Sequence, residues 1–437
     1  MAKPVTGFSK KTKAEKIDWL TKTYLNNNSE ALQTLQQYWN EDQKLQKLHD
    51  DFIENTVTNY YLPFGVAPNF LINGKLFTLP MVIEESSVVA AASNAAKFWL
   101  DRGGFKAQVL STQKNGQVHL DYFGKEQDII SFFAEVKPKL IESVSTIQKN
   151  MKKRGGGLLD IELISKNETL NGYFQLHCTF ETLDAMGANF INSCLEQVAK
   201  TFEAEADSYK PFITTNTFPE VVMSILSNYV PECLVKAEVS CNTTELAQND
   251  ISGEDFANKF VRAIHIAQAE PRRAVTHNKG IMNGIDALIL ATGNDFRAVE
   301  AGVHAYASKD GKYTSLTDAK IEDDVFTFSI KIPLALGTVG GLTSLHPLTK
   351  FAFDLLQKPN AKELMELVAV AGLAQNFALI RSLVTTGIQK GHMKMHLMNI
   401  LNQVDASETE KKIAVAHFND NTVSHSAVIA YVKQLRS

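Results

Sequence analysis

The spacing of hydrophobic and polar residues changes character several times along the chain. Residues 12–58 are rich in Lys, Glu, Gln, Leu and Asn, and helical spacing interrupted at "NNNSE" predicts amphipathic helices there. Residues 60–80 place Pro, Gly and the turn "NGK" between β-forming runs, which predicts a loop and a hairpin. Residues 84–104 predict a helix that opens near Ser86 and Ser87, is capped by their hydroxyls and stops at Gly103–Gly104.

The pattern becomes mixed after residue 105. "FKAQVLSTQKNGQVHLDYF" predicts a hairpin with "KNG" as its turn, and a long helix is expected over 127–153. The strands "LLDIELI" and "GYFQLHCTFE" and the helix "NFINSCLEQVAKTFEAEA" follow. The order ββ-α-ββ-α predicts a small sheet covered by helices on one face.

The remaining sequence predicts a larger mixed structure into which the small sheet is inserted. It contains the strand-like runs "CLVKAEVSC" and "DVFTFSIKIPLAL", a helix over 254–269 and a long apolar helix starting at "AKELMELVAVAG". A smaller helical region follows Gly387. We therefore expect an α+β protein with three domains: a large mixed α/β domain, an inserted domain and a small C-terminal one, with the boundaries 1–108 and 218–386, 109–217, and 387–437.

Composition narrows the classes of function. The 437 residues are 44% hydrophobic and 21% charged, with a formal net charge of −4, which gives no reason to expect binding to nucleic acid or to an anionic membrane. No signal peptide and no run of about 20 apolar residues is apparent. A cytoplasmic protein is expected. The four cysteines form no CxxC pair, and HExxH and HxH spacings are absent, so we expect reduced thiols and no metal site.

Charged residues in an otherwise small and apolar segment, residues 272–308, are the first candidates for chemistry. Lys279 is expected in a loop facing a helix N-terminus, and Asp295 at the start of a second helix. Such a pair would suit proton transfer or an oxyanion site at low dielectric. The structural alternatives are a surface ammonium for Lys279 and an N-cap for Asp295.

Two further groups are candidate acids. Glu85 follows the apolar run "LPMVI", and desolvation there would raise its pKa and suit a general acid. The alternatives are a capping carboxylate, or Glu84 in the same role. His392 follows a glycine-marked break, where a mobile imidazole can donate a proton, although a bystander histidine is the alternative and His396 competes with it.

The glycine-rich segments match no standard nucleotide motif. "KKRGGGLLD" (152–160) and "LGTVGGLTSL" (336–345) fit neither GxGxxG nor GxxxxGK[ST], so a Rossmann or P-loop site is not indicated. Plain tight turns are the alternative to phosphate-binding loops there. "DAMGANFIN" (184–192) places small residues at a helix N-terminus, where anions bind well.

Several motifs, taken in order, resemble one enzyme family. "ENTVTNYYLPFGVAPNF", "EESSVVAAAS", "DAMGANFIN", the segment 272–308, "GTVGGLTSLHP" and "GLAQNFALIRSLVTTGIQKGHM" are similar to hydroxymethylglutaryl-CoA reductase of the soluble bacterial class II branch, from about residue 7 to residue 396. The resemblance implies reduction of HMG-CoA to mevalonate and CoA with two nicotinamide hydrides, in the mevalonate pathway of isoprenoid biosynthesis.

The resemblance also implies roles for the catalytic positions. Lys279 would stabilise the oxyanion, and Glu85 would protonate the aldehyde-level oxygen. Asp295 would tune both through hydrogen bonds. His392 would protonate the departing CoA thiolate from a C-terminal flap, residues 387–437.

Binding residues follow from the same resemblance. The substrate positions are Ser87, Arg273, Asn283 and Asn376, and the Arg273 guanidinium suits the free carboxylate of the substrate. The cofactor would lie on the inserted domain, which is ferredoxin-like in this family. The matching cofactor positions are Asp184, Met186, Gly187, Asn189, Gly337, Gly340 and Gly341.

Partners, cofactor choice and one departure from the family complete the expectations. Glu54 and Asn55 match a segment at the dimer interface, where the family builds its active site, so a homodimer is expected. Lys153 and Arg154, with Lys152, favour the extra phosphate of NADPH, with NADH as the alternative. Ser86 stands where family members have Pro, so the entry to the helix after Glu85 is expected to be less rigid.

Two other functions compete with the biosynthetic reductase. One is catabolic, NAD-dependent oxidation of mevalonate on the same scaffold. The other is a non-catalytic CoA-binding protein, which Lys279, Glu85, Asp295 and His392, all present, disfavour. Nucleic-acid binding by the small sheet is disfavoured because its strands lack the RNP1 pattern.

Overall fold

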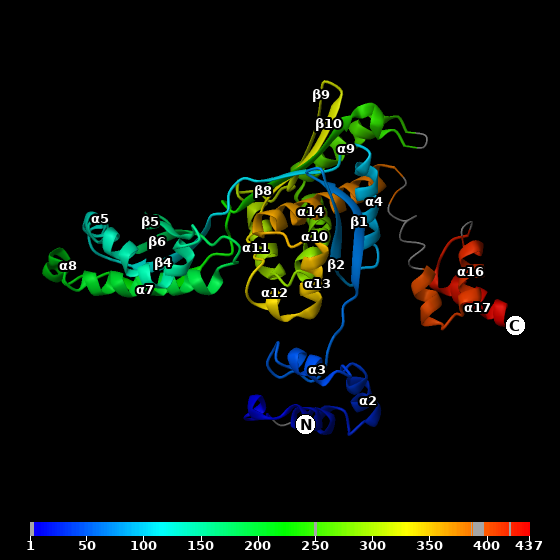
Figure 1. Cartoon of the computed structure of the whole chain (residues 1–437), viewed down its shortest axis with the longest axis horizontal. Coiled ribbons are helices and arrows are strands. Elements are labelled where there is room, and N and C mark those ends of the chain that lie inside the picture. Colours follow the sequence, from blue (N-terminus) through cyan, green and yellow to red (C-terminus); the bar gives the residue numbers. More distant parts are fainter. Residues whose placement is uncertain (1–3, 249–250, 386, 388–396, 419–420) are drawn as a thin grey trace. The chain divides into compact units, whose positions relative to one another are not determined.

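The computed structural model describes residues 4–248, 251–385, 387, 397–418 and 421–437 (Figure 1). Internal contacts divide the chain into two compact units, Met1–Pro63 and Phe64–Ser437. Each is described by itself below.

The first unit is helical, as its sequence pattern predicts. It contains the short 3-10 helix η1 (Phe8–Lys10) and the helices α1 (Lys13–Tyr24), α2 (Ser29–Gln37) and α3 (Gln43–Asp50). The predicted break at "NNNSE" is confirmed, since Asn26 and Asn27 adopt positive φ and Asn28 caps α2. Glu54 and Asn55 follow α3 and line a cavity of about 480 Å³ together with Lys13 and Lys47.

The second unit opens with the predicted hairpin. Strands β1 (Phe64–Ile72) and β2 (Lys75–Val82) pair antiparallel, and Asn73 and Gly74 make the turn with φ of 50° and 79°. Such Asn-Gly turns match the twist of paired strands. The hairpin packs on α4 (Val88–Leu100), whose alanine-rich face is buried, with Ala92 and Ala96 fully covered.

The predicted start of α4 is wrong in one respect. Ser87 is the N-cap residue, yet its hydroxyl makes no capping hydrogen bond, and the helix begins at Val88. The predicted stop is confirmed, because Gly103 and Gly104 follow the helix with φ of 85° and 69°.

A second sheet has the antiparallel order β3-β8-β10-β9, formed by Lys106–Val109, Leu234–Asn242, Val325–Pro333 and Thr317–Glu322. The hairpin predicted over 105–123 is therefore wrong: β3 pairs with β8, and the "KNG" residues begin the strand β4 (Lys114–Asp121) of another sheet. Because β3 and β8 are neighbours, the chain between them is an insertion.

The inserted chain forms the third sheet, with the antiparallel order β5-β6-β4-β7. Its elements are β4, α5 (Glu126–Ser143), α6 (Ser145–Lys152), β5 (Gly157–Ser165), β6 (Tyr173–Glu181), α7 (Ala188–Ala206), α8 (Lys210–Thr215) and β7 (Glu220–Leu226). The predicted single helix over 127–153 is thus two helices. Strand β7 lies beyond the predicted boundary at residue 217, so the sheet extends further along the chain than expected.

The inserted sheet is covered on one face. Alternate residues of its strands, among them Val118, Leu176 and Ile161, share one hydrophobic core with α5 and α7. On the opposite face, the Tyr173 hydroxyl lies 2.6 Å from His119 Nδ1 on the neighbouring strand and accepts from Gln175 Nε2 on its own strand. This alternation is what a half-buried antiparallel sheet requires.

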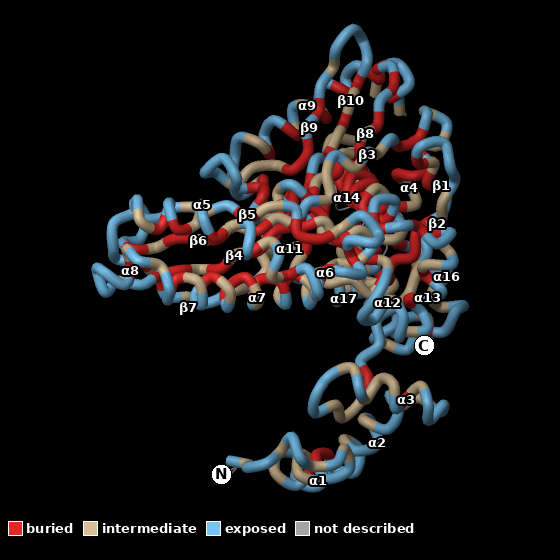
Figure 2. The backbone as a smooth tube through the Cα atoms, turned by 60° about the vertical axis from the view of Figure 1, so that its left-hand side comes forward, coloured by how far each residue is buried: buried red, intermediate tan, exposed pale blue. Residues whose placement is uncertain are grey.

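The hydrophobic core of the large mixed part of the second unit surrounds one apolar helix, α14 (Ala361–Val384), which contacts α4, α9 (Gly253–Ala269), α10 (Pro271–Ala291) and β8. Figure 2 shows buried backbone along α14 and the strands around it. Contrary to the sequence expectation, this helix has the length and composition of a membrane span. Its most apolar window is 67% buried inside the protein, as in a core helix.

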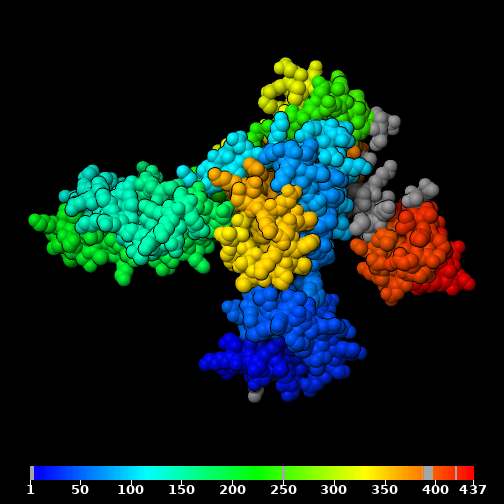
Figure 3. Space-filling model, viewed as in Figure 1, coloured from blue at the N-terminus to red at the C-terminus, as the bar shows by residue number. Residues whose placement is uncertain are grey.

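The remaining elements are η2 (Thr243–Leu246), α11 (Phe296–Tyr306), α12 (Leu342–Leu345), α13 (Pro347–Leu355), α16 (Glu408–His417) and α17 (His425–Arg436). Figure 3 shows the surface of α12 and α13 beside the hairpin β1–β2, where the rings of Phe64 and Phe351 lie 5.9 Å apart. Residues 397–418 and 421–437 have a hydrophobic cluster of their own, which includes Leu401, Ala414 and Val428.

Candidate active site

Helix α10 carries three of the predicted site residues. Pro271 occupies its first turn, and the Glu270 side chain caps it by accepting from Arg273 N. Gly284 lets α10 approach α14 closely, because a Cβ there would collide with Ala371 O. Lys279 is therefore within a continuous helix, and the loop predicted for it is wrong. Its side chain is 64% exposed, which removes the cost of burying an ammonium.

Glu85, Lys279 and Asn283 converge at one point. Glu85 lies in the short segment between β2 and α4, and its Oε2 accepts from Lys279 Nζ at 3.0 Å and from Asn283 Nδ2 at 3.4 Å. Lys279 and Asn283 are four residues apart on α10, so they share one face of the helix. The Glu85 side chain is 37% exposed, so this carboxylate is only partly withdrawn from water in the single chain. Glu84, the competing acid, is exposed.

Asp295 has a different set of partners from the one expected. It is the N-cap of α11, where its Oδ1 accepts from Arg297 N at 3.1 Å and Ala298 N at 3.3 Å, and it forms an ion pair with the Arg297 guanidinium. Within the described chain it makes no hydrogen bond to Lys279 or Glu85. The predicted helix start is confirmed, and the hydrogen bonds that the resemblance implied are not seen. His392 lies outside the described residues.

Arg273 lies six residues before Lys279 on α10 and is half-buried. Burial lowers the pKa of its guanidinium, and among the described residues its buried Nη2 has no hydrogen-bond partner. A buried guanidinium nitrogen without a partner is costly. It therefore suits a site that receives an anion such as the substrate carboxylate. Ser87, also predicted for substrate, is partly exposed with its hydroxyl free of capping.

Asn376, the fourth predicted substrate residue, is fully buried on α14. Its Nδ2 donates to His277 O at 3.4 Å, and its Oδ1 accepts from Thr317 Oγ1 at 3.4 Å. Thr317 Oγ1 also lies 2.6 Å from His277 Nε2. Burial, with Arg273 nearby, lowers the pKa of His277 to about 3, so this histidine is neutral in the folded protein. Asn376 thus belongs to a polar network inside the core, and this network is separate from the hydrogen bonds that Glu85 forms with Lys279 and Asn283.

The predicted cofactor segments, about 150 residues apart in sequence, lie together. Thr338 N donates to Asp184 O at 2.8 Å, and Ala185 and Val339 form a parallel bridge. A Cβ at Gly337 would lie 2.5 Å from Met186 N, so this approach requires glycine. Asn189 follows in the first turn of α7 and is exposed.

The two segments leave backbone groups available to a ligand. Gly187 is the N-cap of α7, with φ of 90° and no side-chain cap, so the first N–H groups of that helix have no capping side chain. Gly340 and Gly341 have positive φ and open space where a Cβ would stand. This combination suits a phosphate at a helix N-terminus.

Lys153 and Arg154 are exposed in the turn after α6. The pairing of Gly157 with Glu181 places this turn at the end of the sheet from which the 182–187 loop begins. No hydrogen bond joins either cation to that loop within the described chain.

Two residues that sequence reasoning missed support the cofactor segments. Asn294 Oδ1 accepts from Gly337 N at 2.8 Å, which ties the glycine loop to the residue before Asp295. Lys114 Nζ donates to Ala185 O at 2.9 Å. The polar run "KNG" read as a turn and concealed Lys114, whereas Asn294 in "GND" adjoined a candidate and was passed over.

Comparisons with known proteins agree with this arrangement. The family model described as hydroxymethylglutaryl-coenzyme A reductase matches residues 13–397. The 3-hydroxy-3-methylglutaryl-coenzyme A reductase of Archaeoglobus fulgidus is 38% identical over 362 residues, covering 83% of this chain and 79% of that protein. A probable enzyme of the same name from Borreliella burgdorferi is 35% identical, covering 89% and 88%.

A solved structure is similar over nearly the whole chain. The class II 3-hydroxy-3-methylglutaryl-CoA reductase from Streptococcus pneumoniae, bound to NADPH in open conformations, is 36% identical with a TM-score of 0.72, covering 98% of this chain and 100% of that one. Its mixed α/β fold is shared here. From the matched model, the identities and the coverage, we conclude that this chain belongs to the hydroxymethylglutaryl-coenzyme A reductase family.

Proposed function

We propose that this protein reduces the thioester of (S)-3-hydroxy-3-methylglutaryl-CoA to (R)-mevalonate and CoA, with NADPH as the hydride donor. Membership of the family supports the reaction, and the NADPH-bound relative supports the cofactor. The observation that carries the proposal is the contact of Glu85 with Lys279 and Asn283, because these side chains come from segments nearly 200 residues apart. Exposed ion pairs contribute little to the stability of a fold, so stability does not explain why these distant residues meet at an exposed surface.

The chain's own residues supply charge stabilisation and protons. Bound NADPH would supply the hydrides. Lys279 stabilises the negative charge that develops on the thioester oxygen, since an ammonium close to an oxyanion acts strongly in a water-poor site. Glu85 protonates the aldehyde-level oxygen in the second reduction. At 3.0 Å, Lys279 and Glu85 are close enough to act on the same oxygen, and Asn283 orients the carboxylate.

Three more residues complete the proposed machinery. Arg273 binds the free carboxylate of the substrate, and Asp295 adds negative charge at the start of α11. His392 protonates the departing CoA thiolate. The substrate pair is HMG-CoA and mevalonate, with CoA as the second product.

We assign the cofactor to the inserted chain between β3 and β8, which forms the third sheet and its helices. The order β4-α5-β5-β6-α7-β7, with both longer helices on one face, matches a ferredoxin-like domain. The segments Asp184–Asn189 and Gly337–Gly341 would hold the phosphates through backbone N–H groups. Lys153 and Arg154 at the same end of the sheet favour the extra phosphate of NADPH over NADH.

The large domain binds HMG-CoA, and residues 387–437 act as the C-terminal flap. We further propose a homodimer with the active site at its interface, as Glu54 and Asn55 indicate. The exposure of Lys279 supports this, because a partner chain would exclude the water that surrounds it in the single chain. The cytoplasm remains the expected location.

Turnover by the purified protein tests the proposal. HMG-CoA and NADPH should give mevalonate, identified by mass spectrometry, with two NADPH oxidised for each CoA released. The rate in both directions with both cofactors separates this function from catabolic mevalonate oxidation by NAD. Binding of HMG-CoA without oxidation of NADPH would instead identify a CoA-binding protein.

A further inference from the structure

Lys114 is a buried lysine that the reaction does not use. It begins β4 and is 4% exposed. Its Nζ donates to Thr182 Oγ1 at 2.5 Å and to Ala185 O at 2.9 Å. Among the described residues it forms no ion pair. Burying an ammonium without a carboxylate partner is costly, so a lysine at this buried position calls for a role.

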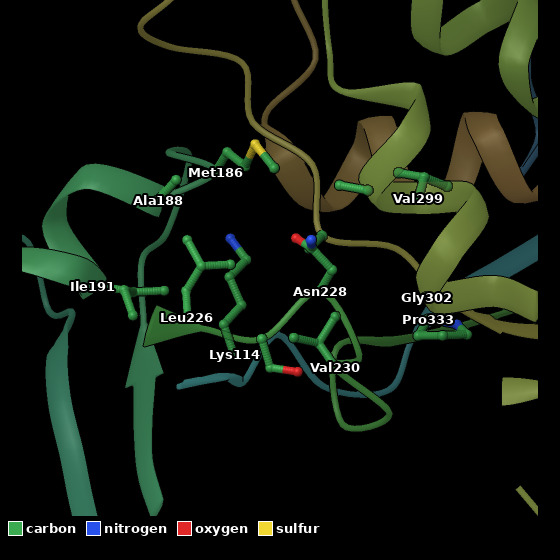
Figure 4. Close-up of a pocket in the computed structure, with 13 residues that line it drawn as sticks. Lys114, Met186, Ala188, Ile191, Leu226, Asn228, Val230, Val299, Gly302 and Pro333 are labelled. Carbon is green, nitrogen blue, oxygen red and sulfur yellow. The ribbon is translucent and has the colours of Figure 1, made fainter. Parts of the chain in front are cut away.

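The ammonium lies beneath the loop that we assign to the cofactor. Figure 4 shows the Lys114 side chain extending from β4 toward the segment of Met186 and Ala188, within a cavity. The cavity measures about 30 Å³, room for about two water molecules. Val299 and Gly302 of α11 form its other side. No ligand of useful size fits there, so the role of Lys114 lies in its bonds to the loop.

Those bonds fix the loop from one side. Thr182 Oγ1 also donates to Ala185 O at 2.7 Å, and a Cβ at Gly187 would lie 2.5 Å from Thr182 Cγ2. Thr182 therefore links Lys114 to the N-cap of α7. From the other side, the loop is held by the glycine segment through the Ala185–Val339 bridge. The loop lies between a buried cation and a backbone pairing.

We propose that Lys114 is a positioning residue for the dinucleotide: it holds the backbone of residues 182–187 in the conformation that presents N–H groups to the phosphates, and it places positive charge behind them. This inference rests on the proposed function and deepens it. The class of ligand is a dinucleotide pyrophosphate, so NADPH and NADH should depend on Lys114 equally.

The surrounding charges agree with this role. Burial lowers the pKa of Lys114, whereas the carboxylates of Glu181 and Asp184 favour the ammonium. Dianionic pyrophosphate beyond the loop would favour it further.

Lys114→Met separates this role from a merely structural one. Methionine keeps the apolar stem and removes the donors. The Thr182–Ala185 bond remains, so no buried carbonyl is stranded. Removal of an unpaired buried charge does not in itself destabilise a fold. Lys166→Met is the matched control, since Lys166 is exposed on the same unit.

The test compares the full-length wild type, Lys114→Met and Lys166→Met. Fluorescence titration should show the Kd for NADPH and for NADH raised about tenfold or more in Lys114→Met, as for loss of a hydrogen bond from a charged donor. Lys166→Met should stay within about twofold of wild type. The Tm and the KM for HMG-CoA should stay near wild type in both variants.

Three results would overturn the inference. Unchanged NADPH affinity in Lys114→Met would remove Lys114 from cofactor binding, while wild-type turnover left the proposed function standing. A parallel loss of Tm, HMG-CoA KM and cofactor affinity would make Lys114 structural only. Wild-type protein that binds no NADPH would overturn both proposals. Thr182→Val, which removes the hydroxyl acceptor, should weaken NADPH binding in the same way and serves if Lys114→Met folds poorly.

Discussion

At the scale of single residues, the contact between Lys279 and Glu85 contributes little to stability. Both side chains are more than a third exposed, and exposed ion pairs contribute about 0–1 kcal/mol. We predict that Lys279→Met lowers kcat/KM by about 10²–10³-fold, the typical loss for an oxyanion stabiliser, with Tm nearly unchanged. Lys320→Met, which breaks the exposed Lys320–Glu322 pair, is the matched control. Near-normal turnover of Lys279→Met would exclude it from catalysis.

Asp295 poses a choice that two substitutions resolve. Its Oδ1 caps α11, and asparagine caps helices about as well as aspartate. Asp295→Asn should therefore keep the Tm while lowering kcat, if the negative charge acts on the reaction. Asp295→Ala should lose the charge and also about 1 kcal/mol of stability through the cap. Full activity in Asp295→Asn would leave Asp295 as an N-cap only.

The proposed role of His392 as proton donor to the CoA thiolate predicts an effect that depends on the leaving group. A thiolate must be protonated when the thioester is reduced, whereas reduction of free mevaldehyde releases none. His392→Ala should thus slow reduction of HMG-CoA more than reduction of mevaldehyde in parallel steady-state assays. Equal losses on the two substrates would contradict its role as donor to CoA.

At the scale of elements, α10 carries a buried histidine, His277, that is neutral in the folded protein. Unfolded histidine titrates near 6.5, while the pKa of His277 is lowered to about 3 by burial. Below pH 6.5 the unfolded chain therefore binds a proton that the folded chain does not, so stability is lost as the pH falls. From about pH 7.5 to about pH 5.5 this linkage costs about 1.4 kcal/mol.

We predict that His277→Gln reduces the fall in Tm over that pH interval. Glutamine does not titrate, and its amide can replace the donor toward Thr317. His265→Gln, at an exposed position on α9, should leave the fall unchanged. If His277→Gln and wild type lose the same Tm, His277 is not the group that titrates.

The sequence predicted local elements better than those that depend on distant partners. The hairpin around Asn73 and Gly74 follows from turn chemistry alone, and so does the break at "NNNSE". The sequence predicts the strand β3 but not its partner, because β8 lies more than 100 residues further along. Lys279 was placed in a loop because Gly280 reads as a helix breaker. Both Gly280 and Gly284 lie inside the continuous helix α10. Gly284 permits close contact with α14, which only the tertiary structure reveals.

Prediction of the candidate site succeeded and failed along the same line between local sequence motifs and contacts with distant residues. The family motifs identified Glu85, Lys279 and Asn283, which the structure joins. They gave no sign that the Asn376 amide forms hydrogen bonds with His277 and Thr317, because hydrogen bonds inside a core follow from packing. Nor could they show Lys114 beneath the loop of residues 182–187, to which we assign the cofactor, since residue 114 meets residue 185 only after the insertion folds.

At the scale of the whole molecule, the proposed cofactor site is shared between the inserted sheet and the large mixed structure. Gly337 is at the contact, where a Cβ would lie 2.5 Å from Met186 N and must displace backbone. Gly337→Ala should therefore raise the KM for NADPH and for NADH together, by about tenfold if one loop hydrogen bond to the cofactor is lost. The KM for HMG-CoA should change much less.

Two variants set the limits of that prediction. Val339→Ala shortens a half-exposed side chain and keeps the backbone bridge to Ala185, so its cofactor KM should stay near wild type. Lys153→Ala with Arg154→Ala should instead lower the ratio of kcat/KM for NADPH to that for NADH, because only NADPH carries the extra phosphate. The loop contact would then govern binding of both dinucleotides, and the cations the choice between them. A ratio changed by Gly337→Ala and left unmoved by the cation variants would place the extra phosphate at the glycine loop instead.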